Sequence, residues 1–156
     1  MNKLFAKINF KNIAIILMIA IFFIADRFLK FLANGKLANI SFKLINDIFT
    51  FNFSANYFIA FSLPLHGPWL NLIIGLIILI LIHFLIKAIK NKEKIITAGL
   101  SLILTGAISN LIDRLLFGYV IDYLYLKYFT IFNLADVYIS VGAILIIISL
   151  YKKPGR

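Results

Sequence analysis

Four apolar stretches, each about 20 residues long, limit most strongly what this chain can become. They cover residues 12–33, 69–88, 95–118 and 132–151. A helix of about 20 apolar residues crosses the hydrocarbon core of a bilayer. The sequence therefore predicts an all-α membrane fold with four transmembrane helices, in a single domain over residues 1–156.

Composition agrees with this class and excludes others. Of the 156 residues, 63% are hydrophobic and only 14% are charged, which is too apolar for a soluble domain of this size. The net charge of +10 is also typical of nucleic-acid binding, but the basic residues cluster in short segments between the apolar stretches. We therefore expect no nucleic-acid partner. The absence of cysteine excludes disulfides, thiol nucleophiles and thiolate metal sites.

The basic residues also predict the orientation in the membrane. Ten of the sixteen precede the first stretch, separate the second from the third, or follow the fourth: Lys3, Lys7, Lys11, Lys87, Lys90, Lys92, Lys94, Lys152, Lys153 and Arg156. By the positive-inside rule both termini are cytoplasmic, and segments 34–68 and 119–131 lie outside. We interpret the first stretch as a retained anchor, because Asp26, Arg27 and Lys30 stand where a signal-peptide cleavage site needs small residues.

Four of the six acidic residues lie within or beside these stretches. With the helical rise, Asp113 lies roughly 8 Å, Asp136 roughly 6 Å and Asp26 roughly 10 Å below the outer ends of their helices. Asp122 follows Gly118 by four residues, so we expect it at the outer surface. All four acids thus converge on one layer near the external interface. Because a carboxylate in hydrocarbon costs several kcal/mol, such a convergence indicates function.

The outer segment before the second stretch predicts a small β element. Apolar and polar residues alternate around Phe42 and again around Phe51, which is typical of two or three short strands within about residues 38–62. So small a sheet must lean on the helices or on the membrane surface. We interpret five aromatic residues as an outer interfacial belt: Trp69, Tyr119, Tyr123, Tyr125 and Tyr128.

Amides and a guanidinium accompany the acids at helical spacing. Asn110, Asp113 and Arg114 share one helix face, and Asn133 precedes Asp136 by three residues. The amides can hold the carboxyl rotamers, while Arg114 can neutralise an acid from a neighbouring helix. The structural alternative is a polar cluster that only joins helices, with Asp26, Arg27 and Lys30 snorkelling at a helix end.

We interpret Asp122 and Asp136 as an aspartyl protease pair. Two carboxyls brought together at low dielectric tend to share one proton, so that one serves as base and the other as acid.

Other proteolytic chemistries fit less well. Zinc catalysis lacks its motif, since His66 and His83 are the only histidines, and we expect no metal and no cofactor. Ser109 and His83 fall at different depths. A pairing of serine with Lys30 is possible, but an i, i+4 ion pair with Asp26 explains this lysine more simply.

With these residues the chain resembles a known family, the bacterial lipoprotein signal peptidases, or signal peptidase II. Four motifs carry the resemblance: Asp26-Arg-Phe-Leu-Lys30, Asn56 to Ser62, the run from Gly106 through Asp113-Arg114 to Gly118-Tyr-Val-Ile-Asp122, and Phe132-Asn133-Leu-Ala-Asp136. The resemblance implies that Asp122 and Asp136 are the catalytic dyad. It implies supporting or substrate-binding roles for six more residues: Asn110, Asp113, Arg114, Asn133, Asn56 and Asp26. It makes the outer sheet a cradle on the membrane surface.

The same resemblance implies a substrate and a location. The substrate would be a prolipoprotein whose cysteine carries diacylglycerol, cut on the amino side of that cysteine by a monomeric enzyme. Membrane lipid would be its other partner, and the active site would lie near the outer face of the bacterial cytoplasmic membrane. The sequence departs from the family pattern at Phe58, where glycine is usual, and in the short connection 123–131.

Two rival functions remain open on the residues alone. Acids beside an arginine also suit a small proton-coupled transporter, although a transporter would place them nearer the midplane. A scaffold protein would use the same polar clusters only to hold helices together.

Overall fold

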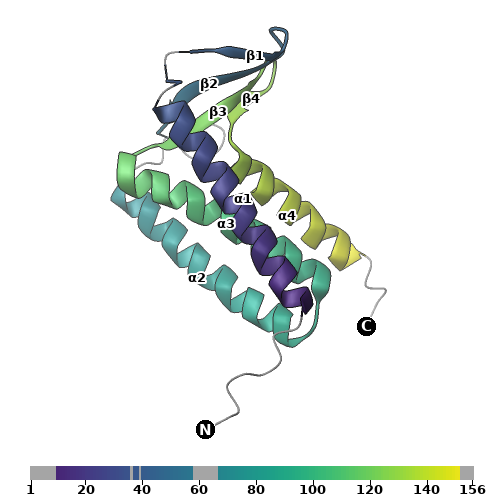
Figure 1. Ribbon diagram of the computed structural model, residues 1–156. Helices are drawn as coiled ribbons and strands as arrows, with labels where there is room; N and C mark the ends of the chain where they lie inside the picture. Colours follow the sequence, from purple (N-terminus) through teal and green to yellow (C-terminus); the bar gives the residue numbers. More distant parts are fainter. Residues whose placement is uncertain (1–9, 36, 39, 58–66, 152–156) are drawn as a thin grey trace.

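The computed structural model describes residues 10–35, 37–38, 40–57 and 67–151, with side chains from residue 17 onward. Four helices form its body (Figure 1). Their bounds are α1 Phe10–Asn34, α2 Pro68–Lys90, α3 Lys94–Phe117 and α4 Leu134–Tyr151. Each predicted stretch corresponds to one helix, with ends displaced by no more than two residues.

Three of these helices, α2, α3 and α4, are long and apolar enough to cross a membrane, judged over the described parts of the chain. The first helix is 25 residues long, but Asp26, Arg27 and Lys30 lie in its second half. That α1 also spans the bilayer stays a prediction.

A four-stranded antiparallel sheet stands at one end of the helices, in the order β1-β2-β3-β4. Its strands are β1 Phe42–Ile45, β2 Phe49–Asn56, β3 Val120–Leu126 and β4 Thr130–Phe132. The sequence predicted strands only in the segment between α1 and α2, which was incomplete. The second outer segment supplies half of the sheet, and the short connection 123–131 contains the β3–β4 turn.

The burial pattern of β3 explains why the sequence did not predict this strand. Its first four residues, Val120 to Tyr123, are all buried, so apolar and polar residues do not alternate along it. Asp122 therefore lies inside the protein, with 2% of its surface exposed, and its depth at the outer face of the membrane stays a prediction.

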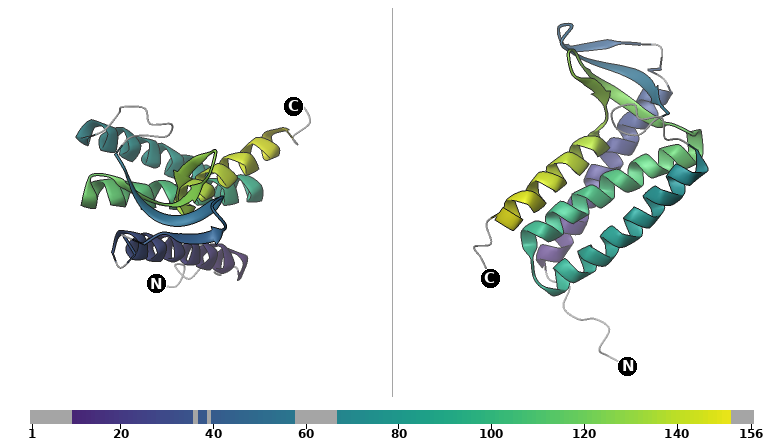
Figure 2. Two further views of the ribbon diagram at one scale, coloured as in Figure 1. Left: turned by 90° about the horizontal axis from the view of Figure 1, so that it is seen from above. Right: turned by 180° about the vertical axis from the view of Figure 1, so that it is seen from behind.

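The sheet leans on the helices, as expected for so small an element. Ala33 near the end of α1 packs with Phe51, Ile121 and Tyr123 in one buried cluster. Figure 2 shows the sheet over one end of the helices, opposite the first residues of α1 and the last residues of α4.

The helices α3 and α4 touch along small residues. A Cβ atom placed on Gly106 would lie 2.3 Å from the carbonyl oxygen of Ala135, and one on Gly142 would lie 2.5 Å from that of Gly99. No side chain fits there, so the glycines allow the two backbones to approach. This contact brings Asn110, one turn after Gly106, beside the first turn of α4.

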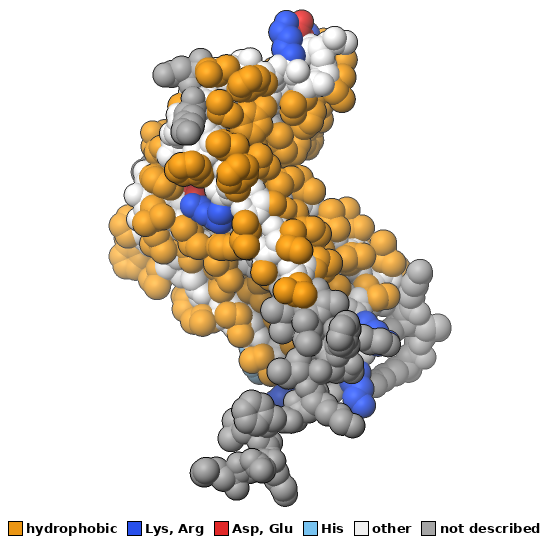
Figure 3. All heavy atoms as spheres, in the orientation of Figure 1, with side chains coloured by type: hydrophobic (Ala, Val, Ile, Leu, Met, Phe, Trp, Pro, Cys, Tyr) orange, Lys and Arg blue, Asp and Glu red, His pale blue; other side chains and the backbone are white. Residues whose placement is uncertain are grey.

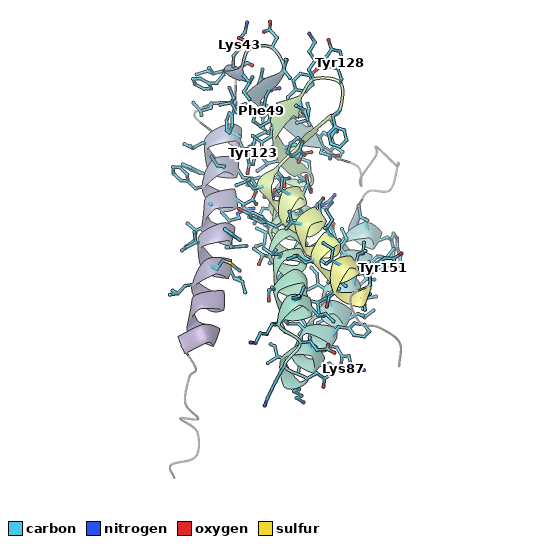
Figure 4. All side chains as sticks on the ribbon, turned by 90° about the vertical axis from the view of Figure 1, so that its right-hand side faces the viewer. Lys43, Phe49, Lys87, Tyr123, Tyr128 and Tyr151 are labelled. Atoms are coloured by element: carbon cyan, nitrogen blue, oxygen red, sulfur yellow. The ribbon has the colours of Figure 1, made fainter. Side chains whose placement is uncertain are left out.

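Apolar side chains cover most of the face that Figure 3 shows, and charged ones lie at its top, near its lower end and in one small patch between them. Figure 4 shows Lys43 and Tyr128 at the tip of the sheet, Lys87 toward the opposite end, and Tyr123 where sheet and helices meet. Residues such as Leu79 on α2 are exposed. Such a surface fits contact with lipid hydrocarbon.

Candidate active site

The first turn of α4 is held by a reciprocal pair of hydrogen bonds. The backbone N–H of Asp136 donates to Oδ1 of Asn133 at 3.0 Å, and the N–H of Asn133 donates to Oδ2 of Asp136 at 3.2 Å. This is the geometry of a capping box, with asparagine and aspartate in place of the usual residues. The i, i+3 spacing seen in the sequence therefore fixes the rotamer of the Asp136 carboxyl.

Asp122, on β3, is held by two side-chain amides. Asn56 at the end of β2 donates from Nδ2 to Oδ2 at 2.9 Å, and Asn133 donates from Nδ2 to Oδ1 at 2.7 Å. Two elements thus position this carboxyl. The strand β2 does so because its Ser54 pairs with Asp122 in the sheet, and the start of α4 does so through Asn133.

The same amides link the two carboxyls, which we call the carboxyl pair. Asn110 on α3 donates from Nδ2 to Oδ1 of Asp136 at 2.9 Å, and its own oxygen accepts from Asn133 at 3.3 Å. Asn133 thus contacts Asp122, Asp136 and Asn110. The site therefore combines Asn56 of β2, Asn110 of α3, Asp122 of β3 and Asp136 of α4.

Burial and the neighbouring charge of Asp136 raise the pKa of Asp122 to about 7. The amide hydrogen bonds from Asn56 and Asn133 work in the opposite direction, but burial outweighs them. Near neutral pH the pair can therefore hold one proton and one negative charge, which is the state that acid–base catalysis by two carboxyls requires.

A second group of charges lies beneath the pair, and we call Asp26, Arg27, Lys30 and Asp113 the ion cluster. Lys30 contacts Oδ2 of Asp113 at 2.8 Å and Oδ2 of Asp26 at 3.2 Å, and Arg27 pairs with Asp113 through Oδ1. Lys30, Asp26 and Asp113 have no exposed surface. The i, i+4 pairing of Lys30 with Asp26 is confirmed. The snorkelling alternative is wrong for Asp26 and Lys30, which do not reach water, whereas 25% of the Arg27 side chain is exposed.

Asp26 joins four elements. Its Oδ2 accepts from Ser109 Oγ at 2.5 Å, and its Oδ1 accepts from Tyr123 Oη at 3.0 Å and from the N–H of Ala135 at 3.2 Å. The helix α1 is thereby tied to α3, β3 and α4 beneath the carboxyl pair.

Arg114 interacts with an acid of a neighbouring helix, Asp136 of α4, in agreement with the expectation. The neutralisation of Asp113 falls to Arg27 and Lys30 of α1. Arg114 interacts electrostatically with Asp136 first, then with Asp122 and Asp113. It also lines a cavity of about 240 Å³, together with Tyr57, Leu70, Asn71 and Gly118 among others.

The geometry argues against a serine nucleophile. The hydroxyl of Ser109 donates to Asp26, and Lys30 Nζ stands 3.5 Å from its oxygen. An ammonium that already contacts two carboxylates cannot accept the serine proton. In the described ranges, no group of three or more histidine or acidic side chains is arranged to hold a metal ion.

Tyr123 is a site residue that the sequence did not identify. It was assigned to the interfacial belt, but it is fully buried, and its hydroxyl accepts from the N–H of Leu134 at 3.1 Å while donating to Asp26. Its position next to Asp122 was the available signal. Phe58, the departure from the family pattern, lies outside the described residues.

Fold and site together define a helical protein with candidate membrane helices and two linked carboxyls beside a small sheet. Comparison with known proteins gives its family. A sequence model described as signal peptidase (SPase) II matches residues 18–152. The chain belongs to the signal peptidase II family. No comparison supports the transporter alternative.

Individual relatives agree with this family. The chain is 36% identical over 146 residues to a lipoprotein signal peptidase of Clostridium tetani, covering 90% of this chain and 94% of the relative. It is 36% identical over 117 residues to one of Streptococcus agalactiae, covering 73% and 75%. A solved structure of a bacterial membrane enzyme superposes with a TM-score of 0.77 and 27% identity, over 92% of this chain and 93% of that one.

Proposed function

We propose that this chain is an intramembrane aspartic endopeptidase that removes the signal peptide from prolipoproteins, with Asp122 and Asp136 as its catalytic residues. One observation carries the proposal: the buried carboxyl of Asp122 on β3 and the half-buried carboxyl of Asp136 on α4 are bridged by Asn133 and share its hydrogen bonds. Family membership supports the proteolytic activity, and relatives are named lipoprotein signal peptidases.

The proposed reaction uses the pair as base and acid. The ionised carboxyl takes a proton from a water molecule as the water oxygen bonds to the scissile carbonyl carbon. The protonated carboxyl donates a hydrogen bond to the oxygen on which negative charge develops. Protonation of the departing amine then breaks the carbon–nitrogen bond. The raised pKa of Asp122 is consistent with a shared proton.

The other predicted site residues divide into two proposed roles. Asn56, Asn110 and Asn133 orient the pair, because each donates to one of its carboxyls. Asp26 and Asp113 support the site from below, since both are fully buried in ion pairs and hydrogen bonds.

Arg114 is the remaining predicted residue, and we propose that it contacts substrate. It lines the cavity of about 240 Å³ and interacts with both members of the pair. A guanidinium there can hold a carbonyl oxygen of the substrate beside the reacting carboxyls.

The substrate we propose is a prolipoprotein with a diacylglyceryl cysteine, cut on the amino side of that cysteine. The lipid would hold the peptide at the membrane surface, at the level where sheet and helices meet. The apolar flanks of the helices support a position in the bilayer next to such a substrate.

The decisive test uses three aspartate-to-asparagine variants. Asp122→Asn and Asp136→Asn should each lose cleavage of a purified diacylglyceryl prolipoprotein by on the order of a thousandfold or more, because each removes an acid–base group. Asp47→Asn is the matched control, since Asp47 is exposed at the sheet tip and pairs only with Lys43 among the described residues. Full cleavage in both of the first two variants, with unfolding temperatures near wild type, would end the proposal.

We propose further that the sheet faces the outside of the cytoplasmic membrane, with both termini in the cytoplasm. Lys43 at the sheet tip and Lys87 near the opposite end mark the two sides. Because the chain has no cysteine, Lys43→Cys and Lys87→Cys each introduce a single thiol. A membrane-impermeant thiol reagent applied to intact cells should label the first and not the second. The reverse pattern would contradict this orientation.

A further inference from the structure

The ammonium of Lys30 has three protons, and three strong acceptors surround it. These are Asp113 at 2.8 Å, Asp26 at 3.2 Å and the side-chain oxygen of Asn110 at 2.7 Å. Two of the acceptors belong to the ion cluster. The third, Asn110, belongs to the site above it, so Lys30 connects the ion cluster to the carboxyl pair.

This contact fixes the direction of the Asn110 amide. A lysine ammonium has donors and no acceptor, so the oxygen of Asn110 must face Lys30, and a flipped amide would set two donors against each other. The NH₂ group is therefore directed to Asp136, where it donates at 2.9 Å. Because the amide oxygen binds a cation, its N–H is polarised and becomes a stronger donor.

The two members of the carboxyl pair thus differ in their surroundings. Asp136 accepts from an amide polarised by an ammonium, and it sits in the first turn of α4, where the helix dipole favours negative charge. Asp122 is on a strand and accepts from the amides of Asn56 and Asn133. The difference favours ionisation of Asp136 before Asp122.

We propose that Lys30 is a positioning residue that acts through Asn110 to keep the resting negative charge on Asp136 and the shared proton on Asp122. The inference rests on the proposed function and deepens it. Asp136 is then the base that takes a proton from water as the oxygen–carbon bond forms. Asp122 is the acid that hydrogen-bonds to the carbonyl oxygen, and the proton held by Asp136 passes to the amine as the carbon–nitrogen bond breaks.

Other charges near the pair bear on this assignment. The titratable or charged side chains around it come from three elements: Asp26, Arg27 and Lys30 of α1, Asp113 and Arg114 of α3, and Tyr123 of β3. The two acids and two bases of the ion cluster balance in charge. Lys30 hydrogen-bonds to the side-chain oxygen of Asn110, whose NH₂ group donates to Asp136. The raised pKa of Asp122 agrees with a proton retained there.

The test compares charge-balanced variants by the pH profile of kcat/KM for prolipoprotein cleavage. Lys30→Met together with Asp26→Asn removes one charge of each sign, whereas Asp26→Asn alone keeps the contact of Lys30 with Asn110. The acid limb, which reports ionisation of Asp136, should move up by about one pH unit in the double variant relative to the single one. Lys43→Met, at the exposed sheet tip, should leave both limbs in place. An unmoved acid limb in the double variant overturns the proposal.

Variants of the two asparagines test the path and the assignment. Asn110→Ala should move the acid limb upward, and adding Lys30→Met with Asp26→Asn should move it no further, because the effect passes through that amide. Asn56→Ala should move the basic limb, which reports Asp122, and leave the acid limb unchanged. Additive shifts, or limbs exchanged between the two asparagine variants, overturn the proposal.

A second readout does not depend on activity. The infrared carbonyl band of a protonated carboxyl, titrated in the substrate-free protein, should follow the same shifts. If the Lys30 variant does not fold, the asparagine variants and this band still decide the matter. Cleavage by Asp136→Asn would defeat the proposed function itself. If Asp136→Asn is inactive but the acid limb does not move in the Lys30 and Asn110 variants, only this inference fails.

Discussion

The ion cluster and the carboxyl pair are neighbours, yet they treat buried acids in opposite ways. In the ion cluster Asp26 and Asp113 are compensated by Lys30 and Arg27 at contact distance. In the pair, three asparagine amides and the backbone N–H of Asn133 donate hydrogen bonds to the carboxyls, and Arg114 interacts with both electrostatically. In the ion cluster, cations offset the charge of the carboxylates. In the pair, burial raises the pKa of Asp122 to about 7, so that the two carboxyls can retain a proton between them near neutral pH.

The kind of partner distinguishes the structural acids from the proposed catalytic ones more clearly than the degree of burial does. Asp113 and Asp122 are almost equally buried, at 0% and 2% exposed. Only the partners differ. An acid in direct contact with cations holds helices together, whereas acid–base catalysis needs a group that both gives and takes a proton during one reaction.

The largest expected effect comes from breaking the ion cluster. Asp113→Ala leaves Lys30 and Arg27 without one of their anions in a buried place, which costs about 3–5 kcal/mol for a buried ion pair that loses one partner. We expect a sharply lower midpoint of thermal unfolding in detergent, followed by the fluorescence of the single tryptophan. Asp122→Asn is the comparison, and it should unfold near the wild-type temperature. Equal losses in both variants would erase the distinction between the two groups.

The sequence predicted the members of both groups better than their arrangement. Spacing along a helix identified Asn110, Asp113, Asn133 and the pairing of Lys30 with Asp26, because these are local relations. The expected convergence of the acids followed from helix length for Asp26, Asp113 and Asp136, and from the distance past Gly118 for Asp122. Contacts across elements, such as that of Tyr123 with Asp26, depend on how β3 lies against α1, which no local pattern encodes.

The sheet, too, was predicted only where local sequence patterns describe it. The strands β1 and β2 were predicted because apolar and polar residues alternate along them, whereas the first four residues of β3 are buried on both faces and do not alternate. Its pairing with β2 brings Ser54 opposite Asp122 across a separation of 68 positions. Such a register is decided by packing on Ala33 and Phe51 and not by the residues of β3 alone.

A smaller effect follows from pH. Because the pKa of Asp122 is raised to about 7, the pair loses its shared proton above that value, and kcat/KM should fall about tenfold per pH unit well above it. The unfolded carboxyl has the ordinary value of 3.8, so the folded state binds this proton more tightly. Its contribution to stability is therefore present at low pH and is lost as the pH rises through about 7. A cleavage rate that keeps rising to roughly pH 9, two units above that value, would show that no shared proton is needed.

The smallest effect is expected at the sheet tip, where Asp47 and Lys43 form an ion pair at 2.7 Å with both side chains largely exposed. The hydrogen bond and charge of Lys43 lower the pKa of Asp47, but water and salt screen such a pair. Asp47→Asn should change neither the unfolding temperature nor cleavage, measured beside the other two variants. Replacing an aspartate would then unfold the protein at Asp113, stop the chemistry at Asp122 and do nothing at Asp47. Since all three residues form close polar contacts, a measurable loss at Asp47 would mean that contact geometry, and not burial together with the kind of partner, decides what an acid contributes here.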